Sequence, residues 1–272
     1  MYKISEIVQI LHPNRTFITD PNSFVQHLFY DSRKIVQADN GVFFALRKSR
    51  DGHHYIKEAY DKGVRNFVLQ VDEEQEQLFP DPNLIWVPDS LASMQVLAAF
   101  HRQRFSFPVI GITGSNGKTI VKERLYQLMS PEYKIYRSPK SYNSQFGVAL
   151  SLWGLSEQYN LAIIEAGISE KGEMAKLESM IKPTIGLLTN VGVAHKAGFD
   201  SKEEKIYEKI NLFKDVETMI FPNSYVEHIQ LPYRPRKFSW GYDEGLSLEV
   251  YSLKQVDDKF TVATLFYGGR TF

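Results

Sequence analysis

Residues 107–119 read FPVIGITGSNGKT, an apolar run that passes into a glycine-containing loop ending in Gly-Lys-Thr. The β-branched run is typical of a buried strand, and residues 121–129 after the loop are compatible with a helix. Glycines in the loop allow the tight turn that directs backbone N–H groups toward an anion. Lys118 then supplies a positive charge for phosphates, and Thr119 supplies a hydroxyl for Mg²⁺. A strand, loop and helix in this order predict a nucleoside triphosphate site. The alternative is a glycine-rich turn followed by Lys-Thr by chance, but such a turn would not need a strand before it and a helix after it.

The loop differs from the most common phosphate-binding loop. The pattern G-x-x-x-x-G-K-[ST] requires glycine at position 112, where this chain has Ile112. Here the spacing is the shorter G-x-x-G-K-T. The residues expected to bind the nucleotide are Thr113, Gly114, Ser115, Asn116, Gly117, Lys118 and Thr119.

Strand and helix patterns alternate after residue 107, which predicts a parallel sheet with helices on its faces. The predicted strands are 108–113, 133–138, 160–166, 184–189 and 217–221, and the predicted helices are 118–129, 144–153, 173–181 and 202–213. Ligands of such sheets bind beyond the carboxyl ends of the strands. Glu165, Asn190 and His195 follow three different strands at that edge.

The predicted fold class is α/β, with two domains. Residues 1–106 have mixed helix and strand patterns, and we expect a small substrate-binding domain there. Residues 107–272 are expected to form a central ATP-binding domain of the P-loop type. Residues 237–267 alternate in β fashion, which predicts a C-terminal β-meander, cut off before its last strand is complete.

Composition excludes several classes of protein. Lys and Arg total 32 and Asp and Glu total 32, so charge gives no reason to expect a nucleic acid or an anionic membrane as partner. No apolar stretch approaches the roughly 20 residues that span a bilayer. The chain has no cysteine, which excludes thiolate chemistry and is compatible with a cytoplasmic location.

Several short segments together resemble the Mur ligase family, whose relatives include the folylpolyglutamate synthetases. These segments are Asp31-Ser32-Arg33, Gly52-His53, residues 113–119 with Lys122-Glu123, Glu165-Ala166-Gly167, and residues 189–195. Their order is most similar to the branch that joins D-alanyl-D-alanine to UDP-N-acetylmuramoyl-tripeptide. One departure is Ile120, where the family usually has a small hydroxylated residue.

The resemblance implies an ATP- and Mg²⁺-dependent ligase of peptidoglycan precursor synthesis, which serves cell wall, cell shape and cell division. Its carboxylate substrate would be activated as an acyl phosphate and attacked by the amine. We expect a cytoplasmic monomer without membrane insertion. The family's C-terminal domain is not found in these residues, so we expect the fragment to be inactive alone; a fused alanine racemase is a further possibility in this branch.

The resemblance also implies roles for single residues, each with a plainer alternative. Lys118, His195 and Lys209 are expected to be catalytic, with Lys209 carbamylated by CO₂. The plainer alternatives are that His195 is a surface residue and that Lys209 is a solvated helix residue. Lys205 is the neighbouring candidate for the carbamylated lysine. The expected metal ligands are Thr119, Glu165, His195 and the Lys209 carbamate. A carboxylate at the end of a strand beside a phosphate loop suits Mg²⁺, but Glu165 could instead be a turn residue.

Substrate contacts are expected at Ser32, Arg33 and Asn143. Arginine suits a pyrophosphate, although the segment could be a surface turn, and Asn143 could also cap the next helix. A zinc site at His53-His54 is rejected because no further spaced ligands accompany the pair. The remaining functional alternatives are a related ligase that adds the third peptide residue, a folylpolyglutamate synthetase, or a nucleotide- and UDP-sugar-binding fragment.

Overall fold

The computed structural model describes residues 1–47, 49–72, 79–192, 199, 201–226, 235–257 and 261–272. The chain divides into two compact units, Met1–Arg104 and Phe105–Phe272. The boundary expected at 106/107 lies two residues from this division. None of the helices in the described ranges has the length and apolar character needed to cross a membrane.

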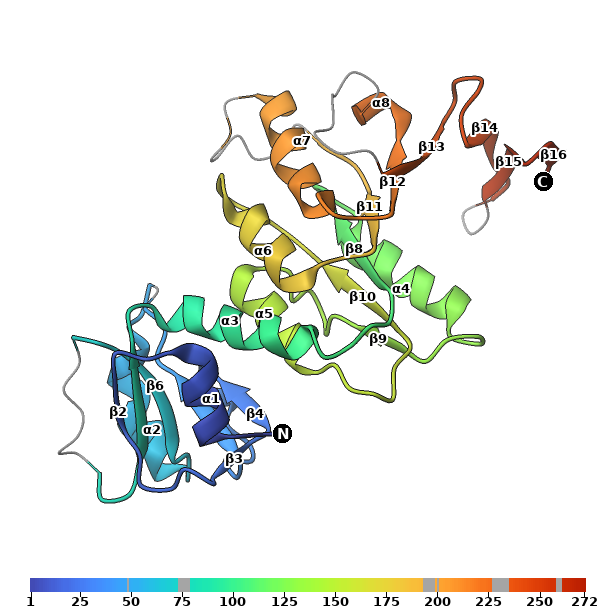
Figure 1. Ribbon diagram of the computed structural model, residues 1–272. Coiled ribbons are helices and arrows are strands. Elements are labelled where there is room, and N and C mark those ends of the chain that lie inside the picture. Colours follow the sequence, from blue (N-terminus) through green and yellow to red (C-terminus); the bar gives the residue numbers. More distant parts are fainter. Residues whose placement is uncertain (48, 73–78, 193–198, 200, 227–234, 258–260) are drawn as a thin grey trace. The chain divides into compact units, whose positions relative to one another are not determined.

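The first unit is built on a five-stranded sheet with the strand order β2-β7-β6-β5-β4 (Figure 1). Strand β2 is antiparallel to β7, and the other neighbours are parallel. A separate two-stranded sheet pairs β1 with β3. The strands are β1 (Tyr2–Lys3), β2 (Arg15–Phe17), β3 (Phe24–Val25), β4 (His27–Phe29), β5 (Gly41–Phe44), β6 (Asn66–Gln70) and β7 (Asn83–Val87). The helices are α1 (Ile4–Leu11), η1 (Ser32–Lys34), η2 (Gly52–Tyr55), α2 (Ile56–Asp61) and α3 (Ser90–Arg102).

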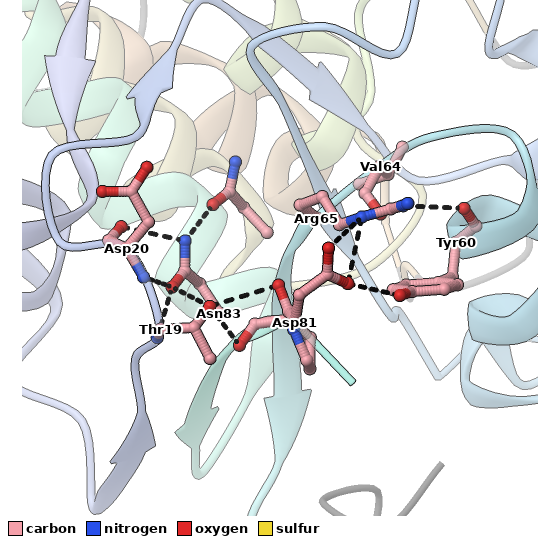
Figure 2. Close-up of polar contacts among 9 residues, drawn as sticks. Thr19, Asp20, Tyr60, Val64, Arg65, Asp81 and Asn83 are labelled. Atoms are coloured by element: carbon pink, nitrogen blue, oxygen red, sulfur yellow. Dashed lines mark hydrogen bonds and ion pairs between the residues drawn. The ribbon is translucent and has the colours of Figure 1, made fainter. Parts of the chain in front are cut away.

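Strands β5, β6 and β7 carry the core of this unit because nearly all of their residues are buried. Two asparagines lie among the apolar side chains. The Asn83 side chain accepts hydrogen bonds from the backbone N–H groups of Thr19 and Asp20, both at 2.9 Å, and donates to Asn66 Oδ1 at 2.7 Å (Figure 2). These bonds satisfy the buried amide and attach residues 19–20 to the sheet.

A second polar group in Figure 2 fixes the chain just before β7. Asp81 accepts hydrogen bonds from the Tyr60 hydroxyl and from Arg65, whose guanidinium also lies over the Tyr60 ring. Residues 72–83 have the acidic, proline-bearing sequence of a surface loop, but Asn83 is buried and begins β7. Asp89 caps α3 by accepting from the N–H groups of Leu91 and Ala92.

The second unit contains a nine-stranded sheet with the order β16-β15-β14-β13-β12-β11-β8-β10-β9. Every pair of neighbours between β9 and β14 in this order is parallel. The pairs β14–β15 and β15–β16 are antiparallel. The strands are β8 (Val109–Thr113), β9 (Ile135–Arg137), β10 (Leu161–Glu165), β11 (Ile185–Leu188), β12 (Thr218–Pro222), β13 (Arg236–Gly241), β14 (Leu248–Gln255), β15 (Thr261–Tyr267) and β16 (Arg270–Thr271). The predicted α/β class and parallel sheet are therefore confirmed.

Helices cover both faces of this sheet (Figure 1). They are α4 (Lys118–Met129), α5 (Gln145–Trp153), α6 (Glu173–Ile181), α7 (Lys202–Ile210), η4 (Asn211–Phe213) and α8 (Asn223–Val226). Apolar residues of α4 pack on Ile110 and Ile112. On the opposite face, Gly186 leaves room for Phe213 of η4, since a Cβ there would lie 2.3 Å from the Phe213 ring, and a Cβ at Gly111 would lie 2.9 Å from Pro183.

The C-terminal strands differ in one respect from the predicted meander. Strand β13 pairs in parallel with β12, so it continues the main sheet. Strands β14, β15 and β16 form an antiparallel meander. Residue alternation identified β13, β14 and β15 as strands, but it carries no information on the direction of pairing.

Candidate nucleotide-binding site

The phosphate loop connects β8 to α4 and is held by the residues that follow β11. Gly114 has φ +148°, and a Cβ there would lie 1.9 Å from Thr189 Oγ1, so only glycine fits. The carbonyl oxygen of Asn190 accepts a hydrogen bond from the Ser115 N–H at 2.7 Å. The side-chain Oδ1 of Asn190 accepts one from the Asn116 N–H at 2.9 Å. Because Asn190 takes up those two donors, an anion would be bound mainly by the N–H groups of the first turn of α4.

Lys118 is the first residue of α4, and its side chain folds back over the loop. Its Nζ donates to Gly114 O at 2.8 Å and to Ser115 O at 3.4 Å. Burial lowers the pKa of Lys118, the charge of Glu165 opposes this shift, and the charge of Lys205 adds to it. An anionic phosphate would relieve this burial of positive charge.

A cavity of about 390 Å³ lies in front of the loop. Its walls come from the loop, from residues 143–144 and 167–169, and from α7; among the described lining residues are three lysines, Lys118, Lys205 and Lys209, and no carboxylate. Such a concentration of positive charge in a concave site favours polyphosphate ligands.

Lys209 is buried, with 3% of its surface exposed. Its Nζ donates to Gly114 O at 3.3 Å. Burial lowers the pKa of Lys209 to about 8, and the charges of Lys118 and Lys205 contribute to the shift. The alternative of a solvated helix lysine is therefore wrong.

Thr119 and Glu165 form the part of the site that suits Mg²⁺. Thr119 Oγ1 donates to Glu165 Oε2 at 3.1 Å, and the carboxylate is fully buried at the end of β10. An octahedral Mg²⁺ with bonds of 2.0–2.1 Å has neighbouring ligands about 3 Å apart. The two oxygen atoms therefore fit neighbouring positions around one Mg²⁺.

Asn143 lies beside this cavity, but it does not cap α5. The cap is Ser144, whose hydroxyl accepts from Gly147 N at 3.4 Å, so the capping alternative for Asn143 is wrong by one residue. The Asn143 carbonyl accepts from Gly167 N at 2.8 Å, and both residues line the cavity. His195 lies outside the described residues.

A second cavity, of about 240 Å³, lies in the first unit. Ser32, Arg33 and Arg50 contribute to its lining. Ser32 is buried and donates to Glu58 Oε2 at 2.8 Å. Arg33 is largely exposed and forms a bidentate ion pair with Asp31, whose pKa is lowered by the hydrogen bond from Arg33.

His53, which we did not assign to a metal, lies within a hydrogen-bonded turn. Its Nδ1 lies 2.5 Å from Asp51 Oδ1, and its Nε2 accepts from the backbone N–H of Gln70 at 3.1 Å. Because Nε2 is an acceptor, the ring proton is on Nδ1 and faces the carboxylate. These bonds join the 52–55 turn to β6.

Comparison with known proteins agrees with this geometry. Residues 112–265, more than half of the chain, match the Mur ligase middle domain. The chain belongs to the Mur ligase family. The fold and family expected from the motifs are thereby confirmed.

Named relatives of this Mur ligase chain include UDP-N-acetylmuramoyl-tripeptide–D-alanyl-D-alanine ligases. The protein from Synechocystis is 38% identical over 63% of this chain and 37% of its own length. The protein from Borreliella burgdorferi is 30% identical over 88% of this chain and 54% of its own length. The chain thus spans about half or less of the length of these relatives. The crystal structure of a MurF ligase from Thermotoga maritima in complex with ADP has a TM-score of 0.79, with 24% identity, and covers 91% of this chain and 57% of that one.

Lys122 was not predicted as a site residue, and Lys205 was named only as the alternative to Lys209 for carbamylation. Lys122 was noted only as part of a motif, yet it is fully buried and lies 2.9 Å from Glu165 Oε1. Lys205 lines the cavity beside Lys118 and Lys209. Its spacing of four residues from Lys209 on one helix face was the available signal.

Proposed function

We propose that this chain is the nucleotide-binding part of an ATP-dependent ligase that joins D-alanyl-D-alanine to UDP-N-acetylmuramoyl-tripeptide. The observation that carries the proposal is the cavity in front of the phosphate loop, with its three lysines and the adjacent Thr119–Glu165 pair. The names of the relatives support the choice of substrates. The ADP bound to the Thermotoga maritima protein supports the choice of nucleotide.

In this proposal the chain positions the reactants and offsets negative charge. Lys118 neutralises the β- and γ-phosphates. Thr119 and Glu165 would hold Mg²⁺, and a bound Mg²⁺ would supply charge stabilisation to the transferred phosphoryl group. The substrate carboxylate takes the γ-phosphoryl group and ADP leaves; the amine then attacks the acyl phosphate and releases phosphate as the amide forms.

Lys209 is proposed to react with CO₂ and, as a carbamate, to hold a second Mg²⁺ together with His195. Carbamylation requires a neutral amine, and a pKa of about 8 makes about one-tenth of the Lys209 amine neutral at pH 7. Burial beside two other lysines thus supports the choice of Lys209. Lys205, which is less buried, is assigned to anion binding.

Substrate binding is proposed at two places. The cavity of the first unit, with Ser32 and Arg33, would bind the UDP-sugar, since arginine can bind a pyrophosphate. Asn143, at the wall of the nucleotide cavity, would contact the reacting carboxylate. We further infer a cytoplasmic location, because the proposed substrates are soluble precursors, and we expect a monomer.

The test is a measurement of ADP release by the full-length protein that contains these residues. With UDP-N-acetylmuramoyl-tripeptide, release should require D-alanyl-D-alanine and yield the pentapeptide. Release with UDP-N-acetylmuramoyl-dipeptide and a diamino acid instead would assign the third-residue reaction. No release with either pair would refute the ligase proposal.

A further inference from the structure

Lys122 is the fully buried residue of α4, a helix whose other residues are partly or wholly exposed. It lies one turn after Lys118, but it is not among the residues that line the nucleotide cavity. Its Nζ donates to Ser138 O at 2.7 Å and to Lys140 O at 2.5 Å. The same atom lies 2.9 Å from Glu165 Oε1 and 3.3 Å from Glu123 Oε1. The ammonium group is therefore held by three segments of the second unit.

The two oxygens of Glu165 have different neighbours. Oε1 is paired with the Lys122 ammonium, and Oε2 accepts from the Thr119 hydroxyl. The Glu165 backbone is fixed as well, because its N–H donates to Ser138 Oγ at 3.1 Å. The carboxylate thus has one oxygen engaged by protein charge and the other beside the hydroxyl that suits Mg²⁺.

Stability alone is a poor reason for this arrangement. A buried ion pair often contributes no more to folding than well-packed apolar side chains of similar volume, because both charges lose their hydration. In contrast, partners that orient a metal ligand are commonly needed for metal affinity. The position of Lys122 behind Glu165 matches this second role.

We propose that Lys122 is a positioning residue for the Mg²⁺ that accompanies the nucleotide. Its ammonium fixes Glu165 Oε1 and leaves Oε2 beside Thr119 for the cation. It also attaches residues 138–140 to α4, which places Ser141 Oγ 3.4 Å from Thr119 Oγ1. This inference rests on the proposed nucleotide site.

The test compares ATP binding by the 272-residue chain with Mg²⁺ and with EDTA, measured by calorimetry. For Lys122→Met, the gain in ATP affinity on adding Mg²⁺ should fall by about 10–100-fold, the usual effect of losing a partner that orients a metal ligand. Affinity in EDTA should change little, because Lys118 still faces the phosphates. Arg124→Met, an exposed change on the same helix, should keep the full Mg²⁺ effect.

The outcomes separate this inference from the proposed function. If the unaltered chain binds no ATP, or if Mg²⁺ does not raise its ATP affinity, both the proposed nucleotide site and the inference are refuted. A Mg²⁺ effect in the unaltered chain that persists in folded Lys122→Met overturns the inference alone. If Lys122→Met does not fold, the same binding measurements are made on Lys122→Gln, which keeps a hydrogen-bond donor. In the unaltered chain, Mg²⁺-ATP should also shift the ¹⁵N signal of the buried lysine ammonium, and an unchanged signal would count against the role.

Discussion

Lys118 and Lys209 share one acceptor, the carbonyl oxygen of Gly114, which lies 2.8 Å from the first ammonium and 3.3 Å from the second. Two cations are thus drawn together by a neutral group in the middle of the phosphate loop. Lys205, on the same cavity wall, adds a third positive charge. An anion that enters the cavity would replace the neutral Gly114 carbonyl with a charged, stronger acceptor for these ammonium groups.

Replacement of Lys118 tests the loop directly. Lys118→Ala should reduce ATP affinity of the 272-residue chain by at least about tenfold, since a charge-assisted hydrogen bond contributes about 1.5–3 kcal/mol. The fold should remain intact, because this side chain contacts the loop and not the apolar core. Calorimetry with ATP measures the effect, with the exposed Lys176→Ala as matched control. Equal affinities in both variants would refute the assignment of the loop.

Gly114 is expected to be irreplaceable. In Gly114→Ala the new methyl group would clash with Thr189 Oγ1, so the loop must move away from Asn190. Gly172→Ala is the control, because Gly172 also has positive φ but open space around it. We expect the control to cost about 1–2 kcal/mol from its left-handed backbone, and Gly114→Ala to cost more and to lose ATP binding. Thermal unfolding and ATP titration of both variants measure the difference. Similar unfolding midpoints and ATP affinities for Gly114→Ala and Gly172→Ala would contradict the requirement for glycine at position 114.

The phosphate loop, its helix and the parallel sheet could be predicted because each has a local signal. Helix 118–129 begins after a glycine and ends where its pattern ends, and helix 173–181 begins after Gly172, so both have the predicted bounds. Strands β2, β3 and β4 were missed, since two or three residues are too few to establish a period.

The site was predictable where side chains have a fixed place relative to the loop. Lys118, Thr119 and Glu165 meet because β8 and β10 are parallel neighbours. The burial of Lys122 was not predictable, since it depends on residues 138–140 and on Glu165, which are distant in the sequence. Lys209 was selected by resemblance alone, and its burial follows from the packing of α7 near the loop.

The charge of Lys209 should make stability depend on pH. Its pKa is about 8 in the folded chain and near 10.5 in the unfolded chain. Below pH 8 both states are protonated and the folded state bears the full cost of the buried charge; between pH 8 and 10.5 the unfolded state binds more protons, so stability rises with pH.

Replacement of Lys209 by Met should therefore stabilise the metal-free chain at pH 7, by about 1–3 kcal/mol, and this difference should shrink as the pH approaches 10.5. Urea unfolding at several pH values, without Mg²⁺ or bicarbonate, measures it. The exposed Lys176→Met should stay within about ±0.5 kcal/mol. A destabilising effect of Lys209→Met that is equal at pH 7 and pH 10 would show that the lysine carries no buried charge.

The carbamate is tested separately, in the full-length protein. Lys209→Ala should lose nearly all ligase activity, and short carboxylates such as acetate or propionate should restore part of it, because they can fill the space with the missing negative charge. Lys205→Ala should not respond to these anions. Full activity of Lys209→Ala would show that the wrong lysine was chosen.

The central claim is that ATP activates the substrate carboxylate by transferring its γ-phosphoryl group. The most direct measurement uses UDP-N-acetylmuramoyl-tripeptide with ¹⁸O in its terminal carboxylate, together with ATP, Mg²⁺ and D-alanyl-D-alanine, in the full-length protein. The amine displaces the phosphate along with one carboxylate oxygen, so each released phosphate should carry one oxygen from the labelled carboxylate, in step with ADP and amide. Unlabelled phosphate, or AMP with pyrophosphate in place of ADP with phosphate, would contradict the account.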